Sequence, residues 1–191
     1  MRFRRSDLTS AQWCCLSTSS PWAAELPSRD PQAFARLHRV SYRFDRQMFE
    51  GLGDRMPPQC SEYVLEPLQE SLVPRIRADL EEGFELGRWG TLPTPGFVAC
   101  AGERCALLAW GPMAGGMVEL GVVTAPQHRN MGLAKRVAAR LICELLAKQW
   151  TPHVSTNATN EPAKHWAESL GFVDPHDHEW LIVKQQSGCT A

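Results

Sequence analysis

Residues 117–134 read MVELGVVTAPQHRNMGLA, and the expected fold is built outward from them. The run 117–124 is apolar and predicts a β-strand, Ala125-Pro126 predicts a turn, and the remainder opens a helix. A turn that leads into a helix N-terminus offers unpaired backbone N–H groups and the positive end of the helix dipole, and Gly132 leaves room for close approach. The turn therefore predicts an anion site, for example for a phosphate group. An ordinary strand-to-helix turn has the same pattern, so this stretch alone leaves both interpretations open.

A long helix, a second strand and a further helix follow this turn. The long helix carries apolar residues at intervals of three and four, which predicts that one of its faces packs on a sheet. These residues are Leu133, Ala134, Val137, Ala138, Leu141, Ile142 and Leu145. Residues 153–159 return to strand character and end at Asn160. Pro162 near its start and Gly171 at its end then delimit the further helix.

Two short apolar runs precede the strand at 117–124. Residues 97–101 and 105–110 are separated by a three-residue turn, and Gly115-Gly116 reverses the chain before the next strand. Strands joined by tight turns pair with their sequence neighbours. These strands are therefore expected to form an antiparallel meander.

The first 90 residues are expected to be mainly helical. Short or imperfect helical patterns cover residues 9–19, 32–49 and 64–86, and the second follows Asp30-Pro31, a typical helix start. Glycines and prolines over residues 50–61 predict a loop. A last strand is expected at 180–184.

Composition limits the function classes. The chain has 191 residues, 43% of them hydrophobic, and a formal net charge of −1, so a single soluble domain is expected and nucleic-acid binding is not. The sequence shows neither a signal peptide nor a membrane span, which predicts a cytoplasmic protein without membrane contact. Seven cysteines without a C-x-x-C pair predict free thiols, including Cys100 and Cys105 on either side of a hairpin turn.

Two motifs together resemble one known family. RNMGLA at residues 129–134 matches the Q/R-x-x-G-x-G/A signature of the GCN5-related N-acetyltransferase (GNAT) superfamily. NEPAKHWAESLGF at residues 160–172 resembles the second signature of that family, N-x-x-A-x-x-x-x-E-x-L-G-F. The resemblance covers residues 97–172, close to the span of the family core. Each motif alone is weak, and their order between the expected elements makes the match specific.

The resemblance implies a mixed α/β (α+β) fold. Its central sheet is mostly antiparallel and is flanked by helices. The sheet splays open between two neighbouring parallel strands, here 117–124 and 153–159. The whole chain would be one acetyltransferase domain: a helical N-terminal part, 1–90, that forms the acceptor site, an acetyl-CoA-binding core, 91–185, and a tail, 186–191.

The resemblance also implies acetyl-CoA as the acyl donor. The pyrophosphate would lie on the backbone of the glycine turn, formed by Arg129, Asn130, Met131, Gly132, Leu133, Ala134 and Lys135. The pantetheine arm would pair with the exposed backbone of Val122, Val123 and Thr124, and Asn160 would contact the same arm.

One position departs from the family pattern. Many members have a tyrosine immediately before the E-x-L-G-F segment, as general acid for the leaving thiolate, and this chain has Ala167 there. His165, Trp166 or a water could replace that acid, or the thiolate could leave without one. Glu119 on the cofactor strand is the candidate general base, because an amine must lose a proton before it attacks. Glu119 could equally end the strand or pair with an arginine.

Three histidines allow other interpretations. His128 precedes the glycine turn and is expected to be a packing residue. His176-Asp177-His178 resembles a metal-binding pair but lacks further ligands at suitable spacing. A polar loop is therefore expected there, and no metal site.

The resulting hypothesis is an acetyl-CoA-dependent N-acetyltransferase. It would transfer the acetyl group to a primary amine of a small molecule or peptide, by direct attack of the amine on the thioester. The alternative is a non-catalytic acyl-CoA-binding or regulatory module on the same fold, which the missing tyrosine favours. A toxin-like enzyme that acetylates a charged tRNA gains little support from the near-neutral charge. The sequence is compatible with a homodimer but does not decide the oligomeric state.

Overall fold

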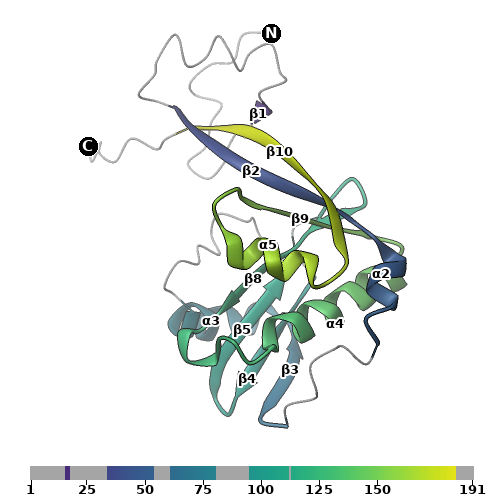
Figure 1. Cartoon of the computed structure of the whole chain (residues 1–191). Coiled ribbons are helices and arrows are strands. Elements are labelled where there is room, and N and C mark those ends of the chain that lie inside the picture. The colour runs from purple at the N-terminus through teal and green to yellow at the C-terminus, as the bar shows by residue number, and fades with distance from the viewer. Residues whose placement is uncertain (1–15, 18–33, 54–60, 81–94, 112, 184–191) are drawn as a thin grey trace, which may run out of the picture.

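The protein is a mixed α/β structure of two sheets and their helices (Figure 1). The computed structural model describes residues 16–17, 34–53, 61–80, 95–111 and 113–183. The first sheet has the strand order β1 (Leu16–Ser17), β10 (Phe172–Val183), β2 (Phe34–Phe44), β9 (Thr151–Asn157), β7 (Met117–Glu119) and β6 (Met113–Ala114). The second has the order β3 (Tyr63–Pro67), β4 (Gly96–Ala101), β5 (Arg104–Trp110) and β8 (Gly121–Thr124). Within the described residues only β7 and β9 pair in parallel.

The expected strand at 117–124 is divided between the two sheets at Leu120. Its first part, β7, pairs with β9, and the last bond of this pairing is donated by the Leu120 N–H to the His153 carbonyl at 2.8 Å. Its second part, β8, pairs with β5 instead, while β9 continues beside β2. The sheet therefore opens between β8 and β9, which confirms the expected splay.

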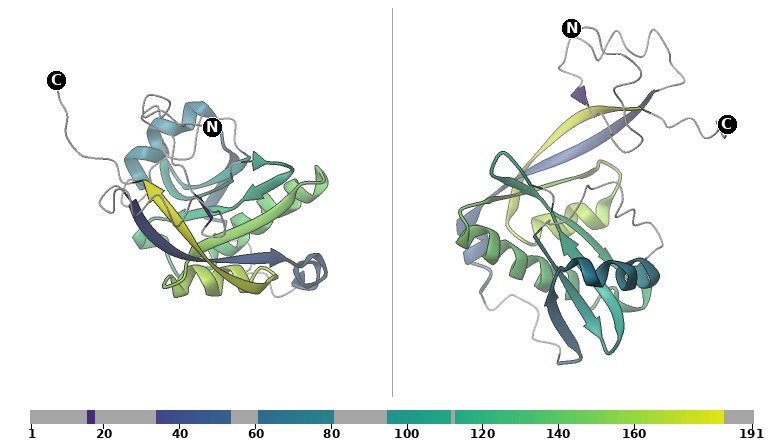
Figure 2. Two further views of the ribbon diagram at one scale, coloured as in Figure 1. Left: turned by 90° about the horizontal axis from the view of Figure 1, so that it is seen from above. Right: turned by 180° about the vertical axis from the view of Figure 1, so that it is seen from behind.

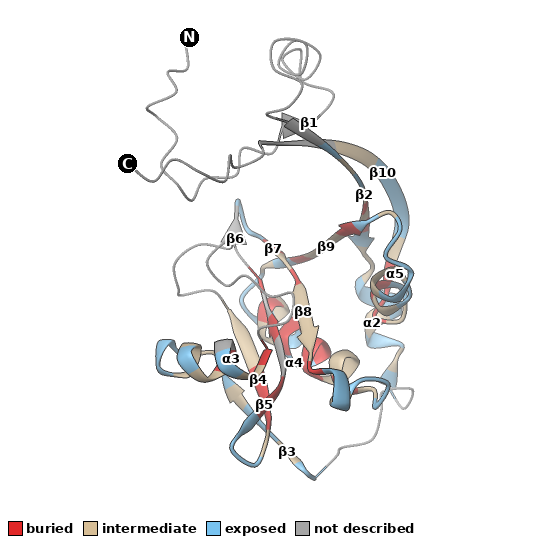
Figure 3. Ribbon diagram, turned by 90° about the vertical axis from the view of Figure 1, so that its left-hand side faces the viewer, coloured by how far each residue is buried: buried red, intermediate tan, exposed pale blue. Residues whose placement is uncertain are grey.

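Helix α4 (Leu133–Ala147) joins the two sheets on one face of the opening. It contacts β4, β5 and β8 of one sheet and β9 of the other. The predicted apolar stripe is confirmed, because these residues of the helix are buried: Leu133, Val137, Ala138, Ala139, Leu141, Ile142 and Leu145. Figure 3 shows the buried residues gathered on α4 and the strands beside it. The helix α5 (Glu161–Glu168) completes this core with Ala167, and Leu170 and Phe172 extend the core beyond the end of α5.

The opposite face of the four-stranded sheet has its own helix. The one-turn η3 (Glu70–Leu72) leads into α3 (Val73–Leu80), whose Ile76 and Leu80 pack with Val98 and with the two buried thiols of Cys100 and Cys105. Those two cysteines face each other across β4 and β5 and are free, as predicted. Burial raises the pKa of both thiols, that of Cys105 to about 12, so they are unreactive core residues.

The helix expected over residues 32–49 is wrong. Phe34–Phe44 forms the strand β2, and only Arg46–Glu50 is helical, as α2. Val40 and Tyr42 are buried two residues apart, as a strand requires, because β2 pairs along its length with β10. Figure 2 shows these two strands as a long curved ribbon.

The other N-terminal expectations hold in part. Residues 64–86 contain β3, η3 and α3 rather than one or two helices, and 81–94 lie outside the described residues. The helix expected over 9–19 also lies largely outside them, although Leu16–Ser17 is the strand β1. The predicted loop at 50–61 is described at its two ends only.

The last strand is longer than predicted. β10 begins at Phe172 rather than at residue 180, and it continues past an irregularity between Val173 and His176. The polar loop expected at 176–178 is therefore wrong, because these residues pair with β2. The described residues contain no cluster of ligands that could hold a metal ion. None of the described helices has the length and apolar character needed to cross a membrane.

Candidate active site at the sheet opening

The glycine turn ends at an uncapped helix N-terminus. After the short helix η5 (Pro126–His128), Asn130 and Gly132 both have positive φ, of 62° and 71°. Gly132 is the N-cap of α4 and provides no side-chain cap, and the first helical bond is donated by the Arg136 N–H to the Gly132 carbonyl. The backbone N–H groups of the first turn therefore point out of the helix at its positive end. This geometry suits a phosphate group.

Neighbouring side chains fix the shape of this turn. The Arg129 Nε donates to the Thr124 carbonyl at 3.1 Å, which ties the turn to the end of β8. Tyr63 on β3 places its hydroxyl 2.9 Å from the His128 Nδ1 and 3.4 Å from the Met131 sulfur. His128 is a packing residue, as predicted, with its ring edge-on to that of Tyr63. No local pattern indicates that Tyr63 belongs to this region, because Tyr63 and His128 are 65 residues apart.

A groove of about 690 Å³ lies beside the turn. It is lined by residues of β3, β4 and α4: Tyr63, Val64, Leu65, Pro67, Phe97, Leu133, Arg136 and Arg140. Arg140 lies over the ring of Phe97 and pairs with Glu144 at 2.7 Å. The groove shares Leu133 with the first turn of α4, so it adjoins the predicted anion site.

Beyond the division at Leu120, the two strands that flank the opening each pair on one side only, β8 with β5 and β9 with β2. Strand β8 is the last strand of its sheet, so the backbone groups on its outer edge, from Val122 to Thr124, face the opening. The side chains of β8 alternate, because Val122 packs with the core under α4 and Val123 packs with that under α3. An extended ligand rich in amide groups could pair with this strand edge.

Glu119 stands at the last rung before the opening, on the face turned away from α4. Its neighbours Val118 and Leu120 are buried in the core under that helix, so the half-buried carboxylate points the other way. Burial raises the pKa of Glu119, and the nearby Arg39 guanidinium opposes this rise. Arg39 Nη2 lies 3.6 Å from Glu119 Oε1.

Arg39 is held firmly by strand β9. Its Nε donates to the Ser155 hydroxyl at 2.8 Å and its Nη2 to the Ser155 carbonyl at 2.6 Å. The arginine pairing considered for Glu119 is thus present, and the same contact leaves the carboxylate at the opening. Burial and the positive charges of His178 and Arg39 lower the pKa of His153, which pairs with Glu119 across the two parallel strands. His153 is therefore neutral at neutral pH.

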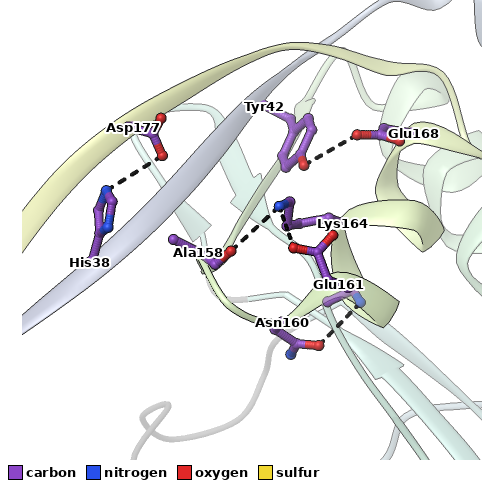
Figure 4. A network of polar contacts seen from close by, with 9 residues as sticks. His38, Tyr42, Ala158, Asn160, Glu161, Lys164, Glu168 and Asp177 are labelled. Carbon is purple, nitrogen blue, oxygen red and sulfur yellow. Dashed lines mark hydrogen bonds and ion pairs between the residues drawn. The ribbon is translucent and has the colours of Figure 1, made fainter.

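Asn160 lies at the start of α5. Its Oδ1 accepts the Ala163 N–H at 3.2 Å, so this side chain is a helix N-cap (Figure 4). Ala167 on the same helix is fully buried in the core. The Tyr42 hydroxyl reaches this helix from β2 and lies 3.5 Å from Glu168. Burial raises the pKa of Tyr42, so its hydroxyl stays protonated.

Of the predicted site residues, the structure therefore brings several to one place. The glycine turn, the outer edge of β8 and Glu119 border the same opening, and Asn160 begins the helix that follows β9. Arg39 and His153 border it too and were not predicted. Their position at the opening could not be predicted from the sequence, because it depends on which strands pair.

Comparison with known proteins places the chain in one group. Residues 4–181 match the model of a family described as GNAT acetyltransferase. No match was found among curated proteins.

Several solved structures resemble this fold, among them proteins described as GNAT acetyltransferases. A GCN5-related N-acetyltransferase-like protein from Streptococcus suis has a TM-score of 0.63 at 18% identity, over 85% of this chain and 68% of that one. An acetyltransferase assigned to the GNAT family from Novosphingobium aromaticivorans has a TM-score of 0.60 at 23% identity, over 81% and 69%. The aminoglycoside N-acetyltransferase AAC(6')-Iy, solved in complex with CoA, has a TM-score of 0.51 at 17% identity, over 69% and 99%.

Proposed function

Because the chain belongs to the GNAT acetyltransferase family, we propose that it transfers the acetyl group of acetyl-CoA to a primary amine of a small molecule or peptide. The observation that carries this proposal is the position of Glu119. A half-buried carboxylate with a raised pKa stands at the rung where the sheet opens, beside an exposed strand edge that leads to an uncapped helix N-terminus. Such a carboxylate is a suitable proton acceptor for an amine.

In this proposal acetyl-CoA occupies the opening. Its pyrophosphate lies on the N–H groups of residues 129–135, and its pantetheine amides pair with Val122, Val123 and Thr124. The groove beside α4, which carries Arg136 and Arg140, receives the nucleotide end. The Asn160 Oδ1 caps α5, so its amide nitrogen is the group left to contact the arm. The complex of AAC(6')-Iy with CoA supports a CoA compound as the ligand of this fold.

The acceptor then approaches the face that carries Glu119. Glu119 takes a proton from the ammonium group, and the neutral nitrogen attacks the thioester carbonyl. The C–S bond breaks, and the thiolate of CoA leaves with the bonding electrons. No described helix covers this face of the six-stranded sheet, and β2 from the N-terminal half supplies Arg39 to it. The N-terminal part thus contributes to the acceptor site as a strand rather than as helices.

A non-catalytic acyl-CoA-binding module is the second candidate. Ala167 at the position of the family tyrosine favours it, as does the pairing of Glu119 with Arg39. The two candidates share the cofactor site and differ only in turnover.

Two measurements test the proposal. Calorimetry with acetyl-CoA is expected to show micromolar binding by the wild type and none by Gly132→Trp, whose side chain would fill the turn. Gly102→Trp is the control, because this glycine also has a positive φ and lies in an exposed turn with open space around it. Equal binding by the Gly132→Trp protein would disprove the placement of the site.

Thiol release from acetyl-CoA is then measured across a panel of primary amines. Turnover with at least one amine, lost in Glu119→Gln, supports the enzyme. Binding without turnover on any amine would favour the binding module.

A further inference from the structure

His153 occupies the point at which the sheet divides. Its carbonyl accepts the Leu120 N–H at 2.8 Å, the last backbone bond between the two strands, so its main chain is fixed. Pro152 and Val154 on either side point into the core, and the half-buried ring of His153 points to the face that carries Glu119. The ring has no hydrogen-bond partner among the described residues.

The groups around this ring are charged or polar. Glu119 is its register partner on the neighbouring strand β7, and the charges of Arg39 on β2 and His178 on β10 act on the ring. On its own strand the nearest side chain of the same face is Ser155, which Arg39 binds. A neutral imidazole and a carboxylate thus lie at the same register of two neighbouring strands, and the guanidinium that Ser155 holds contacts the carboxylate.

Amide formation from an ammonium group needs two proton acceptors. The first proton leaves before attack, and the second leaves the positively charged nitrogen of the tetrahedral adduct. One of the two finally goes to the sulfur of CoA, and the other to water. Nitrogen in the adduct is far more acidic than a free ammonium, so a weakly basic imidazole is sufficient for the second proton.

We propose that His153 is a second catalytic residue, which takes the proton of the tetrahedral adduct and passes it to the departing sulfur. This inference rests on the proposed acetyl transfer. Glu119 takes the first proton from the ammonium group, and the amine lone pair forms the C–N bond. The N–H bond of the adduct then breaks, and its proton moves to the imidazole. The C–S bond breaks with its electron pair on sulfur, and the imidazolium protonates that thiolate.

With His153 in this role, the reaction needs no tyrosine at residue 167. Burial and the charges of His178 and Arg39 lower the pKa of His153, so its imidazolium is a stronger acid than an ordinary one. Proton transfer to a thiolate is then favourable. The Tyr42 hydroxyl lies on the opposite face of the sheet, against α5, and is not required.

The test uses His153→Gln and His153→Gly with an amine that the wild type acetylates. For His153→Gln we expect kcat to fall about 100-fold, with the KM values for both substrates within about twofold. The acid limb of the wild-type pH profile should need two deprotonations, and that of the variant one. Added imidazole should restore activity to His153→Gly. The control is His38→Gln, an exposed histidine of β2 paired with Asp177, which should leave kcat unchanged.

The outcomes separate this inference from the proposed function. An inactive wild type on every amine would remove both. An active wild type with unchanged kcat in His153→Gln would remove only the role of His153. A lower kcat with an unaltered acid limb and no rescue by imidazole would reduce His153 to a structural residue and overturn the inference as well. Acetyl-CoA binding and thermal melting of each variant exclude misfolding as the cause.

Discussion

Arg39 reaches across strand β9 to Glu119, with 3.6 Å between its Nη2 and the Glu119 Oε1. The guanidinium partly offsets the effect of burial on the carboxylate, and it also lowers the pKa of His153. One side chain of the N-terminal half thus lowers the pKa of both candidate proton acceptors.

Arg39→Met should therefore move the acid limb of kcat/KM to higher pH. Without the cation, burial raises the pKa of Glu119 further, and the pKa of His153 rises as well. The loss of activity is expected to be large at mildly acidic pH and small at alkaline pH. A pH series with one acetylated amine measures this. Arg43→Met on the same strand removes an exposed pair with Asp174 and should leave the profile in place.

Asn160 caps α5 and is proposed to contact the pantetheine arm, and two substitutions can separate these roles. Asn160→Ala removes the cap of α5 and should lower the free energy of unfolding by about 1 kcal/mol. Asn160→Ser keeps an oxygen for the Ala163 N–H and should restore most of that stability. If the amide nitrogen contacts the pantetheine arm, both variants should bind acetyl-CoA more weakly in calorimetry. Wild-type affinity in Asn160→Ser would show that the residue only caps the helix.

Gly171, near the end of the second motif, occupies a position at which a side chain does not fit. Its φ is 84°, and a Cβ there would lie 2.8 Å from the Phe49 backbone nitrogen. Gly171→Ala should lower the free energy of unfolding by at least about 2 kcal/mol, from backbone strain together with the forced shift of α2. Urea denaturation measures this loss. Gly102→Ala has a similar φ of 59° with open space around it and should cost about 1 kcal/mol.

Asp79 should make stability depend on pH. Burial opposes ionisation of this carboxylate, but the Cys105 N–H at 2.8 Å and Arg104 at 2.6 Å outweigh it and hold the pKa of Asp79 below its ordinary value of 3.8. The ionised form thus stabilises the fold above that value, and the contribution is lost as pH falls through the lowered pKa. Asp79→Asn should cost about 1–3 kcal/mol at neutral pH and progressively less in acid.

Thermal melting at several pH values follows the Asp79 effect. Glu50→Gln is the control, since this exposed carboxylate pairs with Arg46 one helical turn away and should change stability by less than about 0.5 kcal/mol. A penalty for Asp79→Asn that stays constant down to strongly acidic pH would contradict the argument.

Local sequence patterns were sufficient to predict the elements that form one wall of the opening. The stripe from Leu133 to Leu145 can face only one way on a helix, and the glycine turn before it is defined by its own backbone. The hairpin turns at Gly102 and Gly115 are equally local, because a positive φ favours glycine and the glycine is visible in the sequence. These features depend on neighbours in the sequence, so the sequence predicted them correctly.

The other wall depends on partners far away in the chain. Phe34–Phe44 contains apolar residues at spacings that suit a helix or a strand, and pairing with β10 more than 100 residues later decides for the strand. The same pairing draws residues 176–178 into a sheet. Arg39 reaches the site only because β2 lies beside β9, so no local pattern could have indicated it.

The division of one strand at Leu120 also determines how the opening can move. Beyond that residue the backbone bonds of β8 go to β5 and those of β9 go to β2, so the two edges can separate or close without breaking any of them. Within the part of the chain that the structure describes, the buried face of α4 packs on both sheets and resists such bending. Buried side chains of that face, such as Val137 and Leu141, thus connect the two walls of the opening. If acetyl-CoA binds in the opening as proposed, its fit therefore depends partly on the packing of the hydrophobic core.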